Sequence, residues 1–250
     1  TGRTRRHAAG CAGITVMSEP TDNQSVLSAL YPFTGQAPAV NPNDNDELDS
    51  ALVASVQAKA RDSIAVKQAF FERHSKTLLA AAKRIADSYA QQGKLLTAGN
   101  GGSSCDAAHL AVEFMHPVTT GRKALPAINL SQDTAMMTAV SNDVGTEHVI
   151  TRQLSALANC GDTLVVFSTS GNSANLIEAC KKARAMDLSV IAFTGRTGGE
   201  LQRQQLTDVC ITVPSDSIHR IQECHLACYH ILWDLVHSLL ADSRLSQEKK

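Results

Sequence analysis

The sequence lacks an excess of charge of either sign, a long apolar run and a regular cysteine pattern. Its 23 Lys and Arg residues are balanced by 24 Asp and Glu residues, so no positive field exists to hold a nucleic-acid backbone. The apolar runs, such as Leu164–Phe167, are far shorter than the roughly 18–20 residues of a transmembrane helix. Seven cysteines without a CxxC pair favour a reduced, cytoplasmic protein over a disulfide framework. We therefore expect neither direct nucleic-acid binding nor a membrane span.

The composition is that of a globular protein with an unusual N-terminal stretch. Residues 1–45 are rich in Pro, Asn, Asp and Ser and show no sustained periodicity, which predicts a disordered tail. Met17 lies within this tail and is a candidate for the native start. Residues 46–250 are predicted to form one folded domain, because 43% of the 250 residues are hydrophobic and 19% are charged, enough to bury a sizeable core.

The periodicity of this domain predicts an α/β fold. Apolar residues at three- and four-residue spacing predict an N-terminal helix over 47–64, and a second helix over 66–89. Short apolar runs then alternate with helical stretches, which is typical of a parallel sheet of about five strands with helices on both faces. A long helix over 217–240 ends the pattern. The predicted strands are Lys94–Ala98, Ala127–Leu130, Thr163–Phe167, Ser189–Phe193 and Val209–Val213.

Polar, glycine-rich loops follow three of the predicted strands, at the sheet edge where such folds bind ligands. The first, Gly99–Ser104, precedes a helix expected to begin near Cys105 or Asp106. Its glycines and the helix amides suit an anion, yet it does not match GxGxxG, because residue 104 is Ser, and the chain has no GK[ST] motif. The loop is therefore either a ligand contact or a plain tight turn.

The second loop, Ser168–Ser173, carries four hydroxyl groups in six residues and precedes a helix predicted over 174–186. Hydroxyls and free helix amides form a neutral cradle that suits a phosphate monoester. A single N-cap by Ser173 is the structural alternative, but one cap does not need four hydroxyls. The third loop, Thr194–Gly199, either borders the same pocket or only turns the chain.

Two helices carry residues suited to acid–base or metal chemistry. His109 and Glu113 are four residues apart and project from one helix face. Gln222 and His230 are eight residues apart on the last helix, within about 80° of each other. Two imidazoles, a carboxylate and an amide oxygen could bind a zinc-like metal or supply an acid/base pair.

Together these motifs resemble the phosphoheptose isomerases, the sedoheptulose 7-phosphate isomerase branch of the sugar isomerase (SIS) fold. The resemblance rests on GNGGSSCDAAHLAVEF, SNDVG, STSGNSANLIEA, TGRTGGEL and RIQECHLACYHIL, and it runs from about Val53 to Leu240. It implies a single SIS domain that converts sedoheptulose 7-phosphate to D-glycero-D-manno-heptose 7-phosphate through an enediol. It also implies a homotetramer with active sites at the subunit interfaces.

The same resemblance assigns roles to individual residues. Glu113 matches the general base and His230 the general acid. The zinc positions, with one ion per subunit, are His109, Glu113, Gln222 and His230. The substrate-binding positions are Asn100, Gly101, Gly102, Ser103, Asp143, Ser168, Thr169, Ser170, Ser173 and Gln222.

Two positions depart from the family pattern. Pro117 stands where many members have an Arg, four residues after the catalytic Glu, and Arg122 or Lys123 is the candidate substitute. His219 stands where some members have an acidic residue. These departures keep open an isomerase of another sugar phosphate. A non-catalytic SIS protein that binds a replication-initiator partner is the other alternative, although such proteins typically lose the metal and acid/base residues that this chain keeps.

Overall fold

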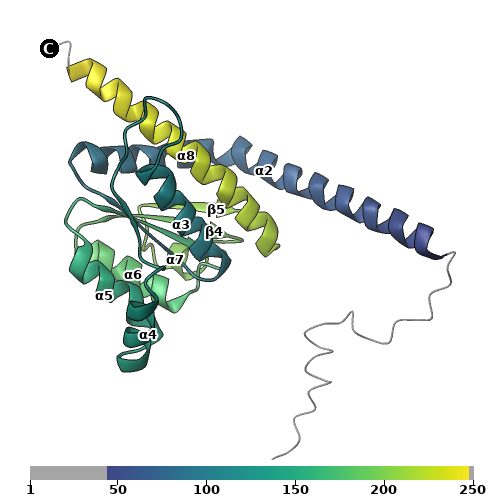
Figure 1. Ribbon diagram of the computed structural model, residues 1–250, viewed down its shortest axis with the longest axis horizontal. Coiled ribbons are helices and arrows are strands. Elements are labelled where there is room, and N and C mark those ends of the chain that lie inside the picture. Colours follow the sequence, from purple (N-terminus) through teal and green to yellow (C-terminus); the bar gives the residue numbers. More distant parts are fainter. Residues whose placement is uncertain (1–43, 248–250) are drawn as a thin grey trace, which may run out of the picture. The chain divides into compact units, whose positions relative to one another are not determined.

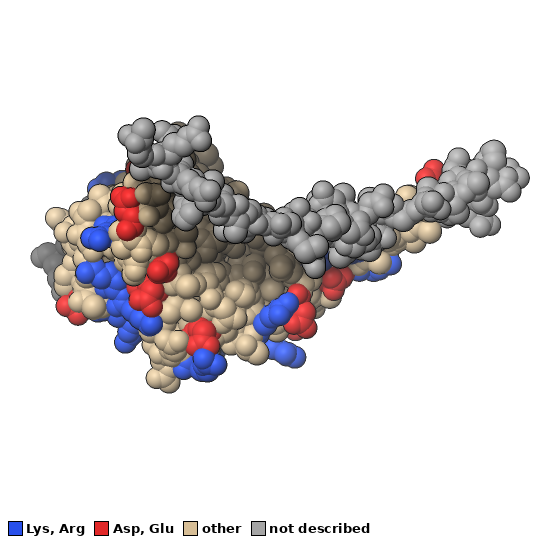
Figure 2. Space-filling model, turned by 90° about the horizontal axis from the view of Figure 1, so that it is seen from below, with Lys and Arg blue, Asp and Glu red and all other residues tan. Residues whose placement is uncertain are grey.

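The computed structural model describes residues 44–247 and the side chains of residues 48–241. The predicted tail 1–45 lies outside the described residues, apart from its last two positions. Among the helices of residues 44–247, none combines the length and the apolar character that a membrane crossing requires. On the face drawn in Figure 2, basic and acidic side chains are interspersed rather than gathered by sign.

The first described element is α2 (Asp44–Ala90), one continuous helix of 47 residues. The prediction of two helices is wrong, because no Gly or Pro stands between residues 44 and 90 to interrupt the backbone hydrogen bonds. The chain divides into two compact units within this helix, after Ala54. In the second unit α2 contributes buried side chains to the core, among them Phe70, Leu78, Ala81 and Ile85.

Five strands form one parallel sheet, as predicted, in the order β2-β1-β3-β4-β5. The order reverses between β1 and β3, because β2 lies on one side of β1 and the later strands lie on the other. Ligands bind at such a reversal, outside the carboxyl ends of the strands. The strands are β1 (Leu95–Gly99), β2 (Ala127–Asn129), β3 (Thr163–Ser168), β4 (Ser189–Gly195) and β5 (Val209–Val213).

Helices cover both faces of the sheet within the second unit (Figure 1). Alternate strand residues feed two separate cores: Val165 and Phe167 pack with α2, α3 and α8, whereas Leu164 and Val166 pack with the helices of the opposite face. Burial on both faces explains the apolar strand sequences. The remaining helices are α3 (Gly102–Met115), α4 (Thr134–Asp143), η1 (Thr146–His148), α5 (Val149–Leu157), α6 (Ala174–Ala185), α7 (Gly199–Arg203) and α8 (Ile218–Gln247).

The helix α3 begins three residues before the first position that the sequence suggested. Gly101 adopts a positive φ of 53° as its N-cap, and the Ser104 backbone N–H donates to the Gly101 carbonyl at 3.0 Å. Gly102 begins the helix although glycine favours it poorly. A Cβ at Gly102 would lie 2.6 Å from Gln222 Nε2 on α8. The first turn of α3 therefore lies against the side-chain amide of Gln222.

Candidate active site

The first two polar loops lie at the two strands where the sheet order reverses, and a pair of amides joins the first loop to the helix that follows the second. Asn100, after β1, donates from Nδ2 to Asn175 Oδ1 at 2.9 Å, and Asn175 donates back to Asn100 Oδ1 at 2.8 Å. Ser131 supports the first loop, because its Oγ accepts from the Gly99 N–H at 3.0 Å and donates to the Gly99 carbonyl at 2.9 Å. The first loop and the start of α6 are therefore connected at the carboxyl edge of β1 and β3.

The hydroxyls of the second loop are divided between its framework and its surface. Ser168 is buried, and its Oγ accepts from the Gly171 N–H at 3.1 Å and lies 3.3 Å from Ser173 Oγ. Ser170 is exposed, while Thr169 and Ser173 are half-buried. Ser173 is the N-cap residue of α6, but its side chain makes no capping hydrogen bond. The capping alternative is therefore not what the hydroxyl of Ser173 does.

The third loop supports the second loop. A Cβ at Gly171, which has a φ of +67°, would lie 2.1 Å from the Gly198 carbonyl oxygen, so the two backbones are in close contact. The Glu200 N–H donates to Asn172 Oδ1 at 2.9 Å, and the Leu201 N–H donates to the Gly171 carbonyl at 3.1 Å. Loop 194–199 does more than turn the chain, because it fixes the shape of the hydroxyl-rich loop.

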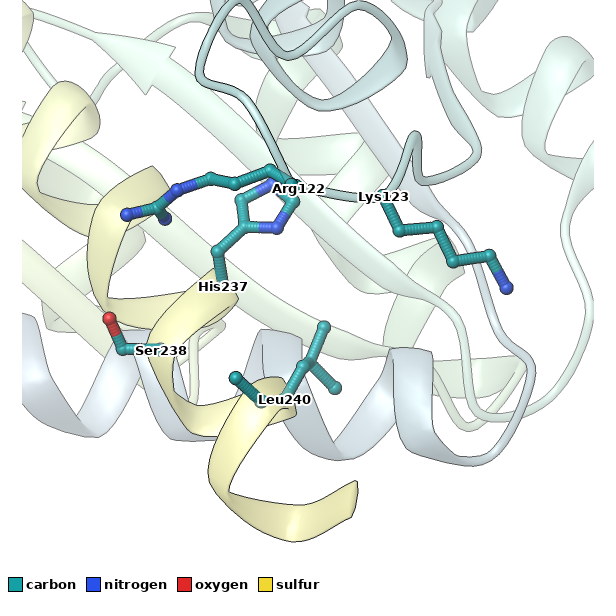
Figure 3. A pocket seen from close by; sticks show the side chains of 7 residues that line it. Arg122, Lys123, His237, Ser238 and Leu240 are labelled. Carbon is teal, nitrogen blue, oxygen red and sulfur yellow. The ribbon is translucent and has the colours of Figure 1, made fainter. Parts of the chain in front are cut away.

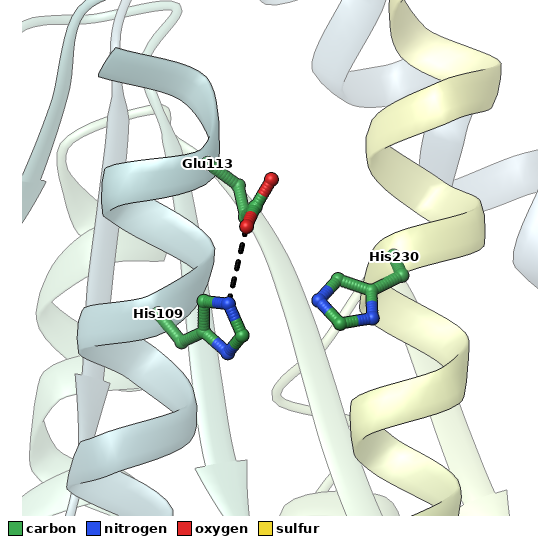
Figure 4. A group of neighbouring side chains, drawn as sticks. All are labelled: His109, Glu113 and His230. Carbon is green, nitrogen blue, oxygen red and sulfur yellow. Dashed lines mark hydrogen bonds and ion pairs between the residues drawn. The ribbon is translucent and has the colours of Figure 1, made fainter. Parts of the chain in front are cut away.

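Three of the predicted metal and acid–base residues come together between α3 and α8 (Figure 4). His109, Glu113 and His230 each offer one ligand atom, and these atoms lie within 4.8 Å of one another. His109 Nε2 and Glu113 Oε1 are 3.1 Å apart, and the two side chains are 41% and 20% exposed. The His109 and His230 rings meet edge to face, with centroids 5.0 Å apart. The cluster is thus accessible on one side and lined by α3 and α8 on the other.

This donor set fits zinc. Two imidazoles and a carboxylate are the protein ligands of many catalytic zinc sites, in which a fourth position stays open for water or substrate. The amide of Gln222 lies beside Gly102. Gly102 precedes His109 by seven residues, so this contact is about 10 Å from His109 along α3. Its role as a further zinc ligand stays a prediction.

Sequence reasoning missed Asp106, which lies near the cluster on the same helix. Its carboxyl oxygen Oδ2 is buried without a hydrogen-bond partner among the described residues. Burial raises the pKa of Asp106 to about 6, and the nearby His109 opposes this rise. Helical spacing could have revealed it, since Asp106 precedes His109 by three residues and Glu113 by seven.

The other predicted substrate residues lie in different surroundings. Ser103 is buried in the first turn of α3, and its N–H donates to the Asn100 carbonyl at 3.0 Å. Asp143 ends α4 and accepts a hydrogen bond from the Asn142 amide at 2.8 Å. The structure does not join Asp143 to the α3 and α8 cluster, so its contact with sugar stays a prediction.

Arg122 and Lys123, the candidate substitutes for the missing Arg, differ in their contacts. The Arg122 guanidinium pairs with the Asp234 carboxylate, donates to the Asp234 carbonyl at 3.2 Å and lies 4.6 Å above the Trp233 ring. Lys123 extends away from Arg122 (Figure 3). Both residues line a cavity of about 200 Å³ beside His237. Since His237 follows His230 by seven residues on α8, this cavity is about 10 Å farther along the helix than the cluster.

The α/β fold and the acid/base cluster indicate an enzyme, and comparison with known proteins identifies its family. Residues 44–195 match the family model described as "SIS domain". A phosphoheptose isomerase from Thiobacillus denitrificans is 42% identical over 194 residues, which cover 77% of this chain and 96% of the relative.

Solved structures agree with the sequence comparison. The phosphoheptose isomerase from Neisseria gonorrhoeae has a TM-score of 0.70 and 39% identity, with 75% of this chain and 99% of that one covered. The corresponding enzyme from Francisella tularensis has a TM-score of 0.66 and 34% identity, with coverages of 78% and 98%. The chain belongs to the phosphoheptose isomerase family of SIS-domain proteins.

Proposed function

We propose that this chain interconverts sedoheptulose 7-phosphate and D-glycero-D-manno-heptose 7-phosphate through an enediol, as an aldose–ketose isomerase of heptose biosynthesis. The observation that carries this proposal is the meeting of His109, Glu113 and His230 within 4.8 Å. The similarity to enzymes named phosphoheptose isomerase supports the choice of sugar. The non-catalytic alternative has no use for an acid/base cluster of this kind.

The reaction needs one base and one group that moves protons between two oxygens. Glu113 takes a proton from carbon 1 of the ketose and returns it to carbon 2, which changes the ketose into the aldose. His230 gives a proton to oxygen 2 and receives the proton that oxygen 1 releases. A carboxylate and an imidazole are suited to these two tasks near neutral pH.

The same cluster is proposed to hold one zinc ion per subunit, through His109, Glu113 and His230, with Gln222 as a further ligand. Zinc would polarise the substrate carbonyl and so make the neighbouring carbon acid stronger. The role of the protein is to keep the two imidazoles and the carboxylate in fixed positions around that carbonyl. This proposal and the assignment of Glu113 as base can be tested separately.

The phosphate group is proposed to bind at loop 168–173. Ser170 offers an exposed hydroxyl, and the half-buried hydroxyls of Thr169 and Ser173 lie beside it in the chain. The first backbone N–H groups of α6 directly follow the same loop, and the helix dipole favours an anion at this end of the helix. A loop without Lys or Arg suits a metabolite that must enter and leave rapidly.

A homotetramer with active sites at subunit interfaces is proposed as the working form. Apolar side chains beside the cluster are exposed: Val112 and Met115 on α3 are 45% and 48% exposed, and Leu226 and Ile231 on α8 are both 40% exposed. Such an apolar rim is typical of a surface that a partner subunit covers. The reduced cysteines predicted from the sequence support a cytoplasmic location.

The test is turnover of sedoheptulose 7-phosphate in D₂O, followed by NMR. Deuterium at carbon 2 of the aldose is expected, because a proton held on Glu113 exchanges with solvent. Glu113→Gln should lower kcat by about 10²- to 10⁴-fold, which is the usual loss for a general base. The control is Glu178→Gln on α6, where Glu178 pairs with Lys181 at 2.8 Å, and it should retain full activity.

Two outcomes would change the proposal. Product free of deuterium, made by an enzyme that still needs Glu113, would favour a hydride shift and leave Glu113 as a metal ligand only. Turnover of a different ketose phosphate in preference to the seven-carbon sugar would retain the chemistry and correct the substrate. Pro117 and the engaged guanidinium of Arg122 make this second comparison necessary.

A further inference from the structure

Two aromatic residues of α8 flank His230, and each makes a hydrogen bond to one of the functional residues on α3. The Tyr229 hydroxyl lies 2.8 Å from His109 Nδ1. The Trp233 indole Nε1 donates to the backbone carbonyl of Glu113, also at 2.8 Å. Both side chains are buried, at 1% and 9% exposed. One helix therefore carries His230 and, on either side of it, a polar contact that reaches α3.

Tyr229 determines which nitrogen of His109 faces the cluster. The hydroxyl occupies Nδ1, so Nε2 is the nitrogen directed to Glu113 Oε1, 3.1 Å away. The Tyr229 ring also meets the His109 ring edge to face, with centroids 5.3 Å apart. A hydrogen-bond partner on the second ring nitrogen holds the orientation of a metal-binding histidine.

Trp233 satisfies a carbonyl that the end of α3 leaves without a helical partner. The last four carbonyls of a helix lack the usual N–H four residues later, unless the following chain supplies one. At this end the Val112 carbonyl accepts from the His116 N–H, and the Phe114 carbonyl accepts from the Leu125 N–H, both at 2.8 Å. The Glu113 carbonyl between them accepts from Trp233. This bond sets the distance between the backbone of Glu113 and the helix that carries His230.

The Trp233 ring is itself held in place. Arg122 lies over one face of the ring, 4.6 Å from its centroid, and is anchored by its ion pair with Asp234. The ring of His237 meets the indole at 66°, with centroids 5.0 Å apart. An indole fixed in this way can hold the Glu113 segment without losing side-chain entropy on each turnover.

We propose that Tyr229 and Trp233 are positioning residues, which hold the His109 ring and the Glu113 segment in register with His230. The inference rests on the proposed isomerase and its zinc site. It makes separate predictions for the two residues. Tyr229 supports the affinity for zinc through His109, and Trp233 supports the rate of proton transfer through Glu113.

The first experiment measures the zinc affinity of Tyr229→Phe by competition with a chromogenic chelator. The affinity is expected to fall 10- to 100-fold, the usual cost of removing such a partner. Saturating zinc should restore most of kcat, which a collapsed fold would not allow. The matched control is Tyr89→Phe on α2, which removes a hydroxyl that donates to the Pro126 carbonyl at 3.2 Å. This variant should leave the zinc affinity unchanged.

The second experiment uses the fact that Trp233 is the only tryptophan in the chain. Incorporation of a benzothiophene analogue in a tryptophan auxotroph keeps the shape of the ring and removes only its N–H. The zinc-loaded enzyme is expected to lose about tenfold or more in kcat, because small errors in orientation are costly. KM should stay within about twofold, since the substrate contacts are unchanged.

The outcomes separate this inference from the proposed function. A wild-type protein that isomerises the sugar and binds zinc, with both substituted proteins at wild-type zinc affinity and kcat, would overturn the positioning roles alone. A wild-type protein that neither binds zinc nor isomerises any sugar phosphate would overturn both proposals.

Discussion

His225 makes the stability of this protein depend on pH. The residue lies on α8, is fully buried, and its Nε2 bonds to the Thr194 carbonyl at 3.0 Å. Its ring also contacts the rings of Phe167 and Phe193. Burial lowers the pKa of His225 from 6.5 to about 4, and the bond to Thr194 opposes this only partly. The folded protein therefore holds His225 neutral where the unfolded chain is already protonated.

The direction and size of the effect follow from the two pKa values. Well above pH 6.5 the ring is neutral in both the folded and the unfolded state, so its titration does not lower the free energy of unfolding. As the pH falls from 6.5 to 4, the unfolded chain binds a proton that the folded protein does not, so the free energy of unfolding decreases. At about 1.4 kcal/mol per pH unit, the loss reaches about 3 kcal/mol near pH 4.

The assay is urea unfolding of wild type and His225→Gln between pH 7.5 and 4, at one protein concentration. Glutamine can still donate to the Thr194 carbonyl but does not titrate in this range, so its free energy of unfolding should fall by about 3 kcal/mol less than that of wild type. His116→Gln, at an exposed position after α3, controls for the removal of a histidine. Parallel pH profiles of wild type and His225→Gln would refute the buried neutral imidazole.

Two further predictions concern the hydroxyl-rich loop. Gly171→Ala should lower the free energy of unfolding by at least about 2 kcal/mol more than Gly121→Ala in thermal or urea unfolding. Both sites have positive φ, but only at Gly171 would the added Cβ lie 2.1 Å from a backbone oxygen. Equal losses would show that the loops can separate. Ser170→Ala should raise KM for the sugar phosphate about three- to tenfold, whereas Ser155→Ala, an exposed serine on α5, should not. An unchanged KM for Ser170→Ala would place the phosphate elsewhere.

The sequence allowed the sheet to be predicted well because its strands are buried on both faces. A strand covered by helices on both sides is largely apolar, so the runs that formed β1 and β3, which are buried throughout, were visible without any knowledge of their partners. The helix ends were less visible. A prediction that begins α3 at Cys105 follows from the low helix propensity of glycine, whereas in the structure the helix begins at Gly102, next to the Gln222 side chain of α8. This neighbour is a tertiary contact that no local pattern shows.

The candidate site was likewise predicted only in part from the sequence. Helical spacing placed His109 beside Glu113, because four residues on one helix fix that geometry. Tyr229 and Trp233 were missed, since their roles depend on how α8 packs against α3 over 120 residues of sequence separation. In the sequence both resemble ordinary core residues of an amphipathic helix.

The arrangement separates the proposed reacting groups from the segment that departs from the family pattern. The His109 ring and the Glu113 backbone are tied to α8 by partly buried hydrogen bonds, so their positions are set by the helix pair. The segment between α3 and β2 carries Pro117, Arg122 and Lys123, and its Arg122 is already engaged with α8. A substitution in this segment is therefore expected to leave the geometry of the cluster intact as long as Arg122 keeps its place over Trp233. For this reason we expect the departure at Pro117 to affect which ketose phosphate is preferred, whereas the proposed proton transfer depends on the residues of α3 and α8.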